Sequence, residues 1–194
     1  MESLLRLGRQ GGDWPSVAFM SLPNIIFLDF DGVICNPRAC LAVRNNGMYS
    51  YLDPIACLLV KRLCEDNNAK LVISSSWRII HDREGIKGIL SAACPGLGEY
   101  VWDSATWWKT TSAVFQNDVH GGCGRGMEIK HWIDNHYAEF QHFVILDDDS
   151  DMEPLMESFV KTDAYDGISF MNFLQAEKIL QGSVFDVRLL YNEE

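Results

Sequence analysis

Three short apolar runs, each ending in polar residues, constrain the fold of this chain more than any other feature. They occupy residues 24–29 (NIIFLD), 70–74 (KLVIS) and 143–147 (FVILD). A run that is apolar at successive positions, without alternation, is typical of a strand buried on both faces of a parallel sheet. A shorter run at residues 158–162 (SFVKT) predicts a fourth strand.

Apolar residues between these runs recur at helical spacing. Asp53 and Pro54 provide an N-cap and a first-turn proline for a helix that we expect to end near Asn67 and Asn68. Further helices are predicted at residues 84–92, 127–137 and 171–180. The alternation predicts an α/β fold, an open parallel sheet with helices on both faces. We assign residues 1–22 to an N-terminal extension, 23–182 to one folded domain and 183–194 to a tail.

Composition narrows the class of protein. The chain has 194 residues, a net charge of −11 and 47% hydrophobic residues, which excludes a disordered chain and a generally basic nucleic-acid-binding surface. No apolar run approaches the roughly 20 residues that span a bilayer, and the first residues do not resemble a secretory signal. The six cysteines form no CxxC pair, which favours reduced thiols and a cytoplasmic protein.

Polar clusters follow the three apolar runs, where ligands bind in open parallel sheets. Asp29 and Asp31 follow the first run, serines 74–76 the second, and the acidic stretch 147–151 (DDDSD) the third. Carboxylates that converge at one edge repel each other unless a cation lies between them, and Mg²⁺ prefers oxygen ligands. A metal next to a free carboxylate makes phosphoryl transfer to that carboxylate feasible.

The segment FLDFDGVI at residues 27–34 resembles the first motif of the haloacid dehalogenase (HAD) superfamily, a strand followed by DxDG. Ser74 is similar to the serine or threonine of the second motif, and Asp147 with Asp148 to the acidic fourth motif. The resemblance covers roughly residues 24–180. It implies the Rossmann-like HAD core. The short connections after the first two motifs predict a minimal cap or none, and hence an open site.

A narrower resemblance links the chain to a HAD branch associated with RNA-repair proteins. The segments ISSSWR (73–78), RGMEI (125–129), VILDDDSDM (144–152) and FVKTD (159–163) carry it. It implies a phosphorylated substrate, with a nucleic-acid end or a nucleotide as the candidate classes. The local cations that we expect to bind such a substrate are Arg38, Arg44, Arg78, Arg83, Lys87 and Lys109.

The resemblance also implies roles for individual residues. Asp29 is the expected nucleophile and a Mg²⁺ ligand, and Asp31 is the expected general acid and base, with its backbone carbonyl on the metal. The metal site is completed by Asp147 and Asp148, with Asp151 as an alternative to one of them. These roles imply a Mg²⁺-dependent phosphatase that works through an aspartyl-phosphate. The alternatives are another phosphoryl-transfer enzyme of this fold and a catalytically silent binding module.

Several assignments have two interpretations. Ser74 is expected to bind the phosphoryl group. Ser75 is the alternative, because three consecutive serines leave open which of them occupies the motif position. The third-motif cation is expected to be Arg125, just before the predicted helix, with Lys130 one turn inside that helix as the alternative. Arg78 either clamps a substrate phosphate or pairs with a nearby Asp. The tryptophans at 102, 107 and 108 either pack a loop, which we favour, or stack on bases.

Overall fold

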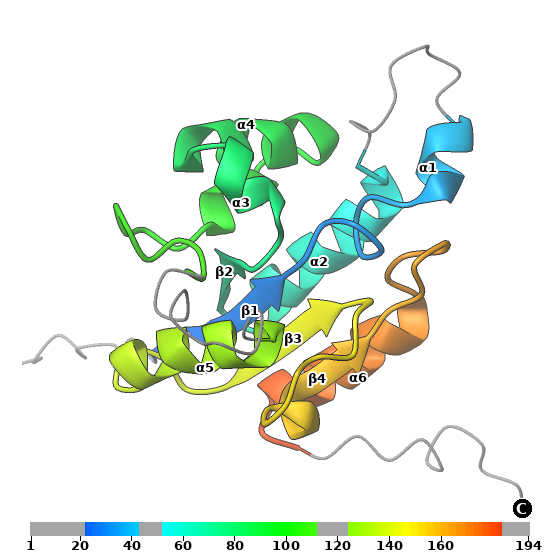
Figure 1. Cartoon of the computed structure of the whole chain (residues 1–194). Helices are drawn as coiled ribbons and strands as arrows, with labels where there is room; N and C mark the ends of the chain where they lie inside the picture. Colours follow the sequence, from blue (N-terminus) through cyan, green and yellow to red (C-terminus); the bar gives the residue numbers. More distant parts are fainter. Residues whose placement is uncertain (1–21, 43–51, 112–123, 184–194) are drawn as a thin grey trace, which may run out of the picture.

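The computed structural model describes residues 22–42, 52–111 and 124–183 (Figure 1). Four strands form one parallel sheet in the order β2-β1-β3-β4. The strands are β1 Asn24–Leu28, β2 Ala69–Ile73, β3 Phe143–Asp147 and β4 Phe159–Lys161. All four predicted strands are therefore confirmed.

Six helices and two 3-10 helices surround the sheet in the described ranges. They are α1 Pro37–Ala42, α2 Pro54–Asp66, α3 Trp77–Ile80, α4 Arg83–Ala93, η1 Leu97–Tyr100, α5 Arg125–His136, η3 Met156–Ser158 and α6 Phe170–Leu180. The four helices predicted from periodicity are confirmed as α2, α4, α5 and α6. The Asp53 side chain caps α2 as expected, accepting the backbone N–H of Ile55 (2.9 Å). The sequence did not indicate α1 and α3, because helices of six and four residues are too short to establish a period.

Helices cover both faces of the sheet, as predicted. One face packs on α2 and α6 through a cluster that includes Leu28, Val60 and Ala176. The other face packs on α5, where Trp132 meets Phe27 edge to face with ring centroids 5.3 Å apart. Because the sheet is covered on both sides, every residue of β1 is buried, which explains the uninterrupted apolar run.

Strand register brings the polar residues together. β1 pairs in register with both of its neighbours. The backbone N–H of Asp29 donates to the carbonyl of Leu146 (3.0 Å), and that of Ser74 donates to the carbonyl of Leu28 (3.0 Å). The chain therefore leaves the sheet with Asp29, Ser74 and Asp147 at one level of the carboxyl edge.

Residues 101–109, which follow η1, line the edge of β2. The first and last of them form isolated bridges, Val101 with Leu71 and Lys109 with Ile73. Trp108 is buried at 4% exposure, so its predicted packing role is confirmed. Trp102 and Trp107 are half-buried and pack against the cluster under α5.

The connections after the first two motifs carry only short elements in the described ranges. Residues 32–42 and 52–73 form α1, α2 and β2, and residues 79–111 form the end of α3, α4, η1 and the segment beside β2. No helix in these ranges is long and apolar enough to cross a membrane. Cys57, Cys64 and Cys94 are buried free thiols. Nearly all of the predicted extension and tail, together with Arg44, lies outside the described residues.

Candidate active site

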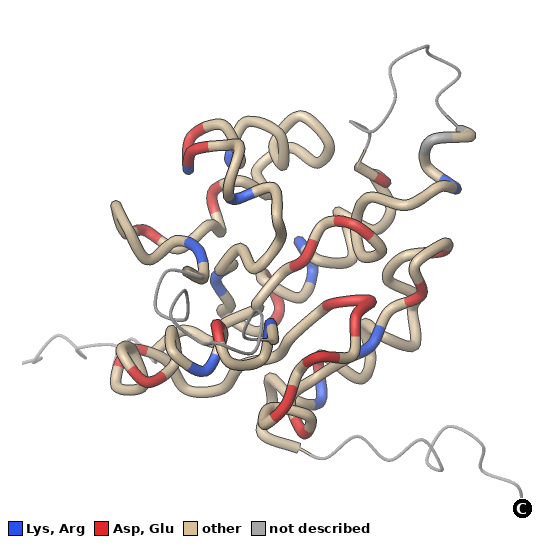
Figure 2. Tube along the Cα trace, viewed as in Figure 1, with Lys and Arg blue, Asp and Glu red and all other residues tan. Residues whose placement is uncertain are grey.

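Three carboxylates meet at the carboxyl edge of the sheet. Ligand oxygens of Asp29, Asp147 and Asp148 all lie within 4.8 Å of one another. Figure 2 shows these acidic segments directly after β1 and at the end of β3. Gly32 makes this approach feasible, because a Cβ at that position would overlap the Asp148 carboxyl group, and its φ of +68° favours glycine. The structure thus brings together three of the four predicted metal ligands through their side chains.

The electrostatics of this cluster favour a bound cation. Burial, and then the neighbouring Asp29 carboxylate, raise the pKa of Asp147 to about 7. Burial likewise raises the pKa of Asp29 and of Asp148. The Asp147 Oδ2 is buried and accepts no hydrogen bond from any described residue, whereas Oδ1 accepts the backbone N–H of Asp149 (2.9 Å). Buried carboxylate oxygens that lack partners are the donor set that a hard divalent cation prefers, so these residues fit the predicted metal.

Arg125 supplies positive charge beside the three carboxylates. It is the first residue of α5, and its Nη1 lies 3.4 Å from Asp29 Oδ1 while its Nε lies 4.0 Å from Asp147 Oδ2. Its guanidinium also donates to the backbone carbonyl of Ser74. Lys130 instead pairs with Asp134 at 2.6 Å on the exposed side of α5. Of the two third-motif candidates, only Arg125 contacts the cluster.

Asp151 holds the start of α5 in place. Its carboxylate accepts the backbone N–H of Arg125 (2.8 Å), and its carbonyl accepts that of Gly126 (2.9 Å). A Cβ at Gly126 would overlap the backbone of Met152 and Glu153, so the helix starts in close contact with this loop. Asp151 therefore positions Arg125, and it does not belong to the group of three converging carboxylates.

Both candidate serines lie at the cluster. Burial has the largest effect on the Asp29 carboxyl and raises its pKa. The Ser75 hydroxyl hydrogen-bonds this carboxyl and partly opposes that rise. The Ser74 hydroxyl is fully buried and has no hydrogen-bond partner among the described residues. Ser75 is thus the serine in direct contact with the expected nucleophile.

Arg78 is bound within the protein. Its side chain is buried and pairs with Glu128 of α5 at 2.6 Å. Its Nε donates to the Thr110 carbonyl (3.0 Å), and its Nη1 donates to the carbonyls of Ser74 and Ser75. Of the two interpretations from sequence, the ion pair is the one observed, with a Glu in place of the expected Asp. These contacts tie the serine loop to α5.

Asp31 differs from the other carboxylates because it is exposed. Its Oδ2 accepts the indole N–H of Trp77 (3.0 Å), and the indole packs on Phe30 with ring centroids 5.2 Å apart. Trp77 is the contact that sequence reasoning missed. Its place directly after the three serines was the available signal, because a residue one turn beyond a strand end can reach the neighbouring motif.

Four of the cations expected to bind the substrate form contacts within the chain. Arg38 pairs with Asp53 (2.8 Å), Arg83 with Asp103 (2.9 Å) and Lys87 with Glu84 (3.5 Å). Lys109 donates to the Arg78 backbone carbonyl (2.8 Å). Since each of these cations is engaged within the chain, contact with a nucleic acid stays a prediction.

Comparison with known proteins identifies the fold family. Residues 25–172 match the family model described as the HAD domain in Swiss Army Knife RNA repair proteins. The search of curated proteins found no match, and neither did the search of solved structures. The matched range spans β1 to the start of α6 and contains every candidate site residue named above. The chain therefore belongs to this family of HAD domains.

Proposed function

We propose that this protein is a Mg²⁺-dependent phosphatase that hydrolyses phosphomonoesters through an aspartyl-phosphate on Asp29. The observation that carries the proposal is the convergence of Asp29, Asp147 and Asp148, with Arg125 against the same carboxylates. Three carboxylates and one guanidinium leave excess negative charge, so the cluster is complete only with a further cation.

The three carboxylates would hold the metal, and the unpartnered Asp147 Oδ2 is the atom that most needs it. When bound, Mg²⁺ would neutralise phosphate charge and so let an anionic carboxylate approach phosphorus. Arg125 and the Ser75 hydroxyl are the groups we assign to the remaining phosphoryl oxygens, because both contact Asp29.

In the first step a carboxylate oxygen of Asp29 attacks phosphorus, and the bond from phosphorus to the leaving oxygen breaks. Asp31 donates its proton to that oxygen. In the second step Asp31 takes a proton from water, whose oxygen attacks phosphorus and releases Asp29 and inorganic phosphate. The exposed position of Asp31 supports this role, because its carboxyl group must exchange protons with both the leaving group and water.

The substrate class that we propose is a phosphorylated nucleic-acid end or a nucleotide. The family description, an RNA-repair domain, supports this class. The short connections in the described ranges also favour an open site that can admit a macromolecular end.

Release of inorganic phosphate tests the proposal. The panel comprises an aryl phosphate, mononucleotides and oligoribonucleotides with a 5′- or 3′-terminal phosphate, each assayed with Mg²⁺, with Ca²⁺ and with excess chelator. We expect turnover with Mg²⁺, little with Ca²⁺ because its bonds are longer and its ligands more numerous, and none with chelator. An Asp29→Asn protein purified in parallel controls for contaminating phosphatases. No release from any substrate would favour the binding-module alternative, and far better turnover of mononucleotides would exclude the macromolecular substrate.

A further inference from the structure

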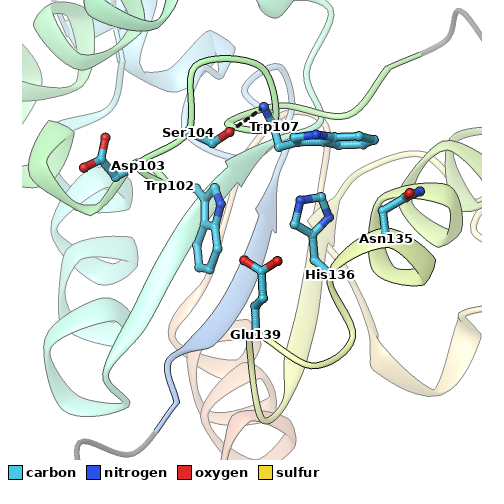
Figure 3. Close-up of a pocket in the computed structure, with 7 residues that line it drawn as sticks. All are labelled: Trp102, Asp103, Ser104, Trp107, Asn135, His136 and Glu139. Carbon is cyan, nitrogen blue, oxygen red and sulfur yellow. Dashed lines mark hydrogen bonds between the residues drawn. The ribbon is translucent and has the colours of Figure 1, made fainter.

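A second pocket lies at the opposite end of α5 from Arg125 (Figure 3). Its volume is about 440 Å³, within the range of small-molecule sites. The helix between the two sites has 12 residues and is about 18 Å long. The pocket is lined by Trp102, Asp103, Ser104, Trp107, Asn135, His136 and Glu139. None of these residues belongs to the carboxylate cluster.

Three aromatic side chains, those of Trp102, Trp107 and His136, line this pocket together with polar groups. The His136 ring stacks on Trp132 at 4.2 Å and meets Trp107 edge to face at 4.7 Å. Trp102 lies on the other side of the opening in Figure 3 and packs edge to face on Trp132 (5.7 Å). The Trp132 indole N–H donates to the Trp107 carbonyl (2.7 Å). The rings are thus held in place by the core, yet Trp102 and Trp107 are only half-buried, so part of each indole stays available for a ligand.

Two side chains in the lining, those of His136 and Glu139, offer hydrogen-bond acceptors to a ligand. His136 Nδ1 lies 2.8 Å from the Trp132 carbonyl, which can only accept, so the neutral ring offers Nε2 as an acceptor. The Glu139 side chain forms no salt bridge with any described residue, and Figure 3 shows its carboxylate pointing into the space between Trp102 and His136. Asp103 points away in the same view and pairs with Arg83.

No lysine or arginine lines the pocket, so it is unsuited to a phosphate. The two tryptophans and the acceptors in the lining instead favour a flat heterocycle whose edge carries N–H donors. Guanine fits best among the bases, because its N1–H and exocyclic N2–H₂ lie side by side and match the two oxygens of one carboxylate.

We propose that this pocket binds a guanine base, with Glu139 on its Watson–Crick edge and Trp102 and Trp107 against its rings. The inference goes beyond the phosphatase proposal. It would give the protein a base-selective contact remote from the carboxylate cluster.

Equilibrium dialysis of the full chain against guanosine tests the proposal. Guanosine carries no phosphate, so its binding does not depend on the carboxylate cluster or on turnover. We expect saturable binding, unchanged in Asp29→Asn. Inosine, which lacks the N2 amino group, should bind at least fivefold more weakly.

The Glu139→Gln variant should bind guanosine at least tenfold more weakly and should no longer prefer guanosine to inosine. The reason is that the amide replaces one of the two charged acceptor oxygens with a donor. Glu139 is exposed, so the substitution leaves the core intact. Glu157→Gln makes the same charge change at an exposed position in η3 and should bind as the parent does. Equal guanosine binding by the Glu139→Gln variant and the parent would overturn the proposal. The absence of saturable guanosine binding to the parent would also overturn it. Binding of tetramethylammonium in place of guanosine would overturn it too, because that result would indicate a site for organic cations.

Discussion

Asp29 and Asp31 are two residues apart, yet they lie in opposite surroundings. Asp29 belongs to an inner half of the site, formed by Asp29, Asp147 and Arg125, in which Asp29 is 6% and Asp147 is 1% exposed. Asp31 belongs to an outer half, formed by Asp31 and Trp77, where the carboxylate is exposed and accepts one indole N–H. Two identical side chains that follow the same strand therefore lie in environments that suit different chemistry.

The difference matches the two roles that we propose for the carboxylates of this motif. In the inner half, burial raises the pKa of Asp29 and Asp147, so a bound cation and Arg125 are needed to keep both carboxylates ionised. A desolvated carboxylate held in this way is a better nucleophile than a hydrated one. In the outer half, contact with water would let Asp31 exchange a proton in each proposed step.

Replacing Asp29 tests the inner half most directly. Asp29→Asn keeps the shape of the side chain but removes the nucleophile, so kcat for an aryl phosphate should fall by about 10⁴-fold or more. Asp149→Asn is the matched control, because Asp149 is exposed and contributes only its backbone N–H to Asp147. Near-normal turnover by the Asp29→Asn protein would contradict the assignment.

The metal-free stability of the protein tests the charge balance of the inner half. The pKa of Asp147 is about 7 in the folded protein and about 4 when unfolded, so the folded state binds this proton more tightly. The stability due to this group is therefore present below about pH 4 and is lost as the pH rises to 7.

Asn cannot ionise, so the stability of Asp147→Asn relative to the parent should rise by about 2–3 kcal/mol between pH 5 and pH 8. Urea unfolding in excess chelator at several pH values measures this difference. Saturating Mg²⁺ should reduce it, because the metal stabilises the ionised carboxylate only in the parent. A difference that does not change with pH would mean that Asp147 is ionised in the folded protein throughout this range.

Asp31→Asn tests the outer half. The loss of proton donation should slow the hydrolysis of an alkyl phosphate by about 10³-fold. Hydrolysis of an aryl phosphate should slow only about tenfold, because a good leaving group needs little protonation. The ratio of kcat/KM for the two substrates is the measurement. Equal losses on both would show that Asp31 is not the general acid.

Arg125→Ala should raise KM for every phosphate substrate by about 10–100-fold, because one charge-assisted contact to the phosphoryl group is lost. Lys130→Ala is the control, since Lys130 lies one turn further along α5 and pairs only with Asp134 in the described structure. A larger effect at Lys130 than at Arg125 would reverse the assignment of the third-motif cation.

The sheet could be predicted from sequence because both of its faces are covered. Burial on both sides makes β1 and β3 continuous apolar runs, and their ends place Asp29 and Asp147 without any knowledge of tertiary contacts. The choice of Arg125 over Lys130 followed from its position at the start of α5, where the structure indeed places it beside the carboxylates.

The long-range contacts could not be predicted in this way. Arg78 and Glu128 are 50 residues apart, and no local pattern indicates that one pairs with the other. Asp151 resembled a ligand by spacing, but its carboxylate binds the backbone of α5, because that helix starts against residues 151–153. Trp77 was missed for the same reason, since only the packing of α3 on Phe30 brings its indole to Asp31.

Trp77→Phe isolates that contact and should have the smallest effect. The substitution keeps a ring against Phe30 but removes the hydrogen bond to Asp31 Oδ2, worth about 1 kcal/mol. The hydrogen bond also fixes the orientation of the Asp31 carboxylate, so its loss should affect mainly the substrate that depends on proton donation. The rate on an alkyl phosphate should fall about fivefold, and that on an aryl phosphate should barely change. A uniform loss on both substrates would mean that Trp77 only packs α3 and that Asp31 works independently of it.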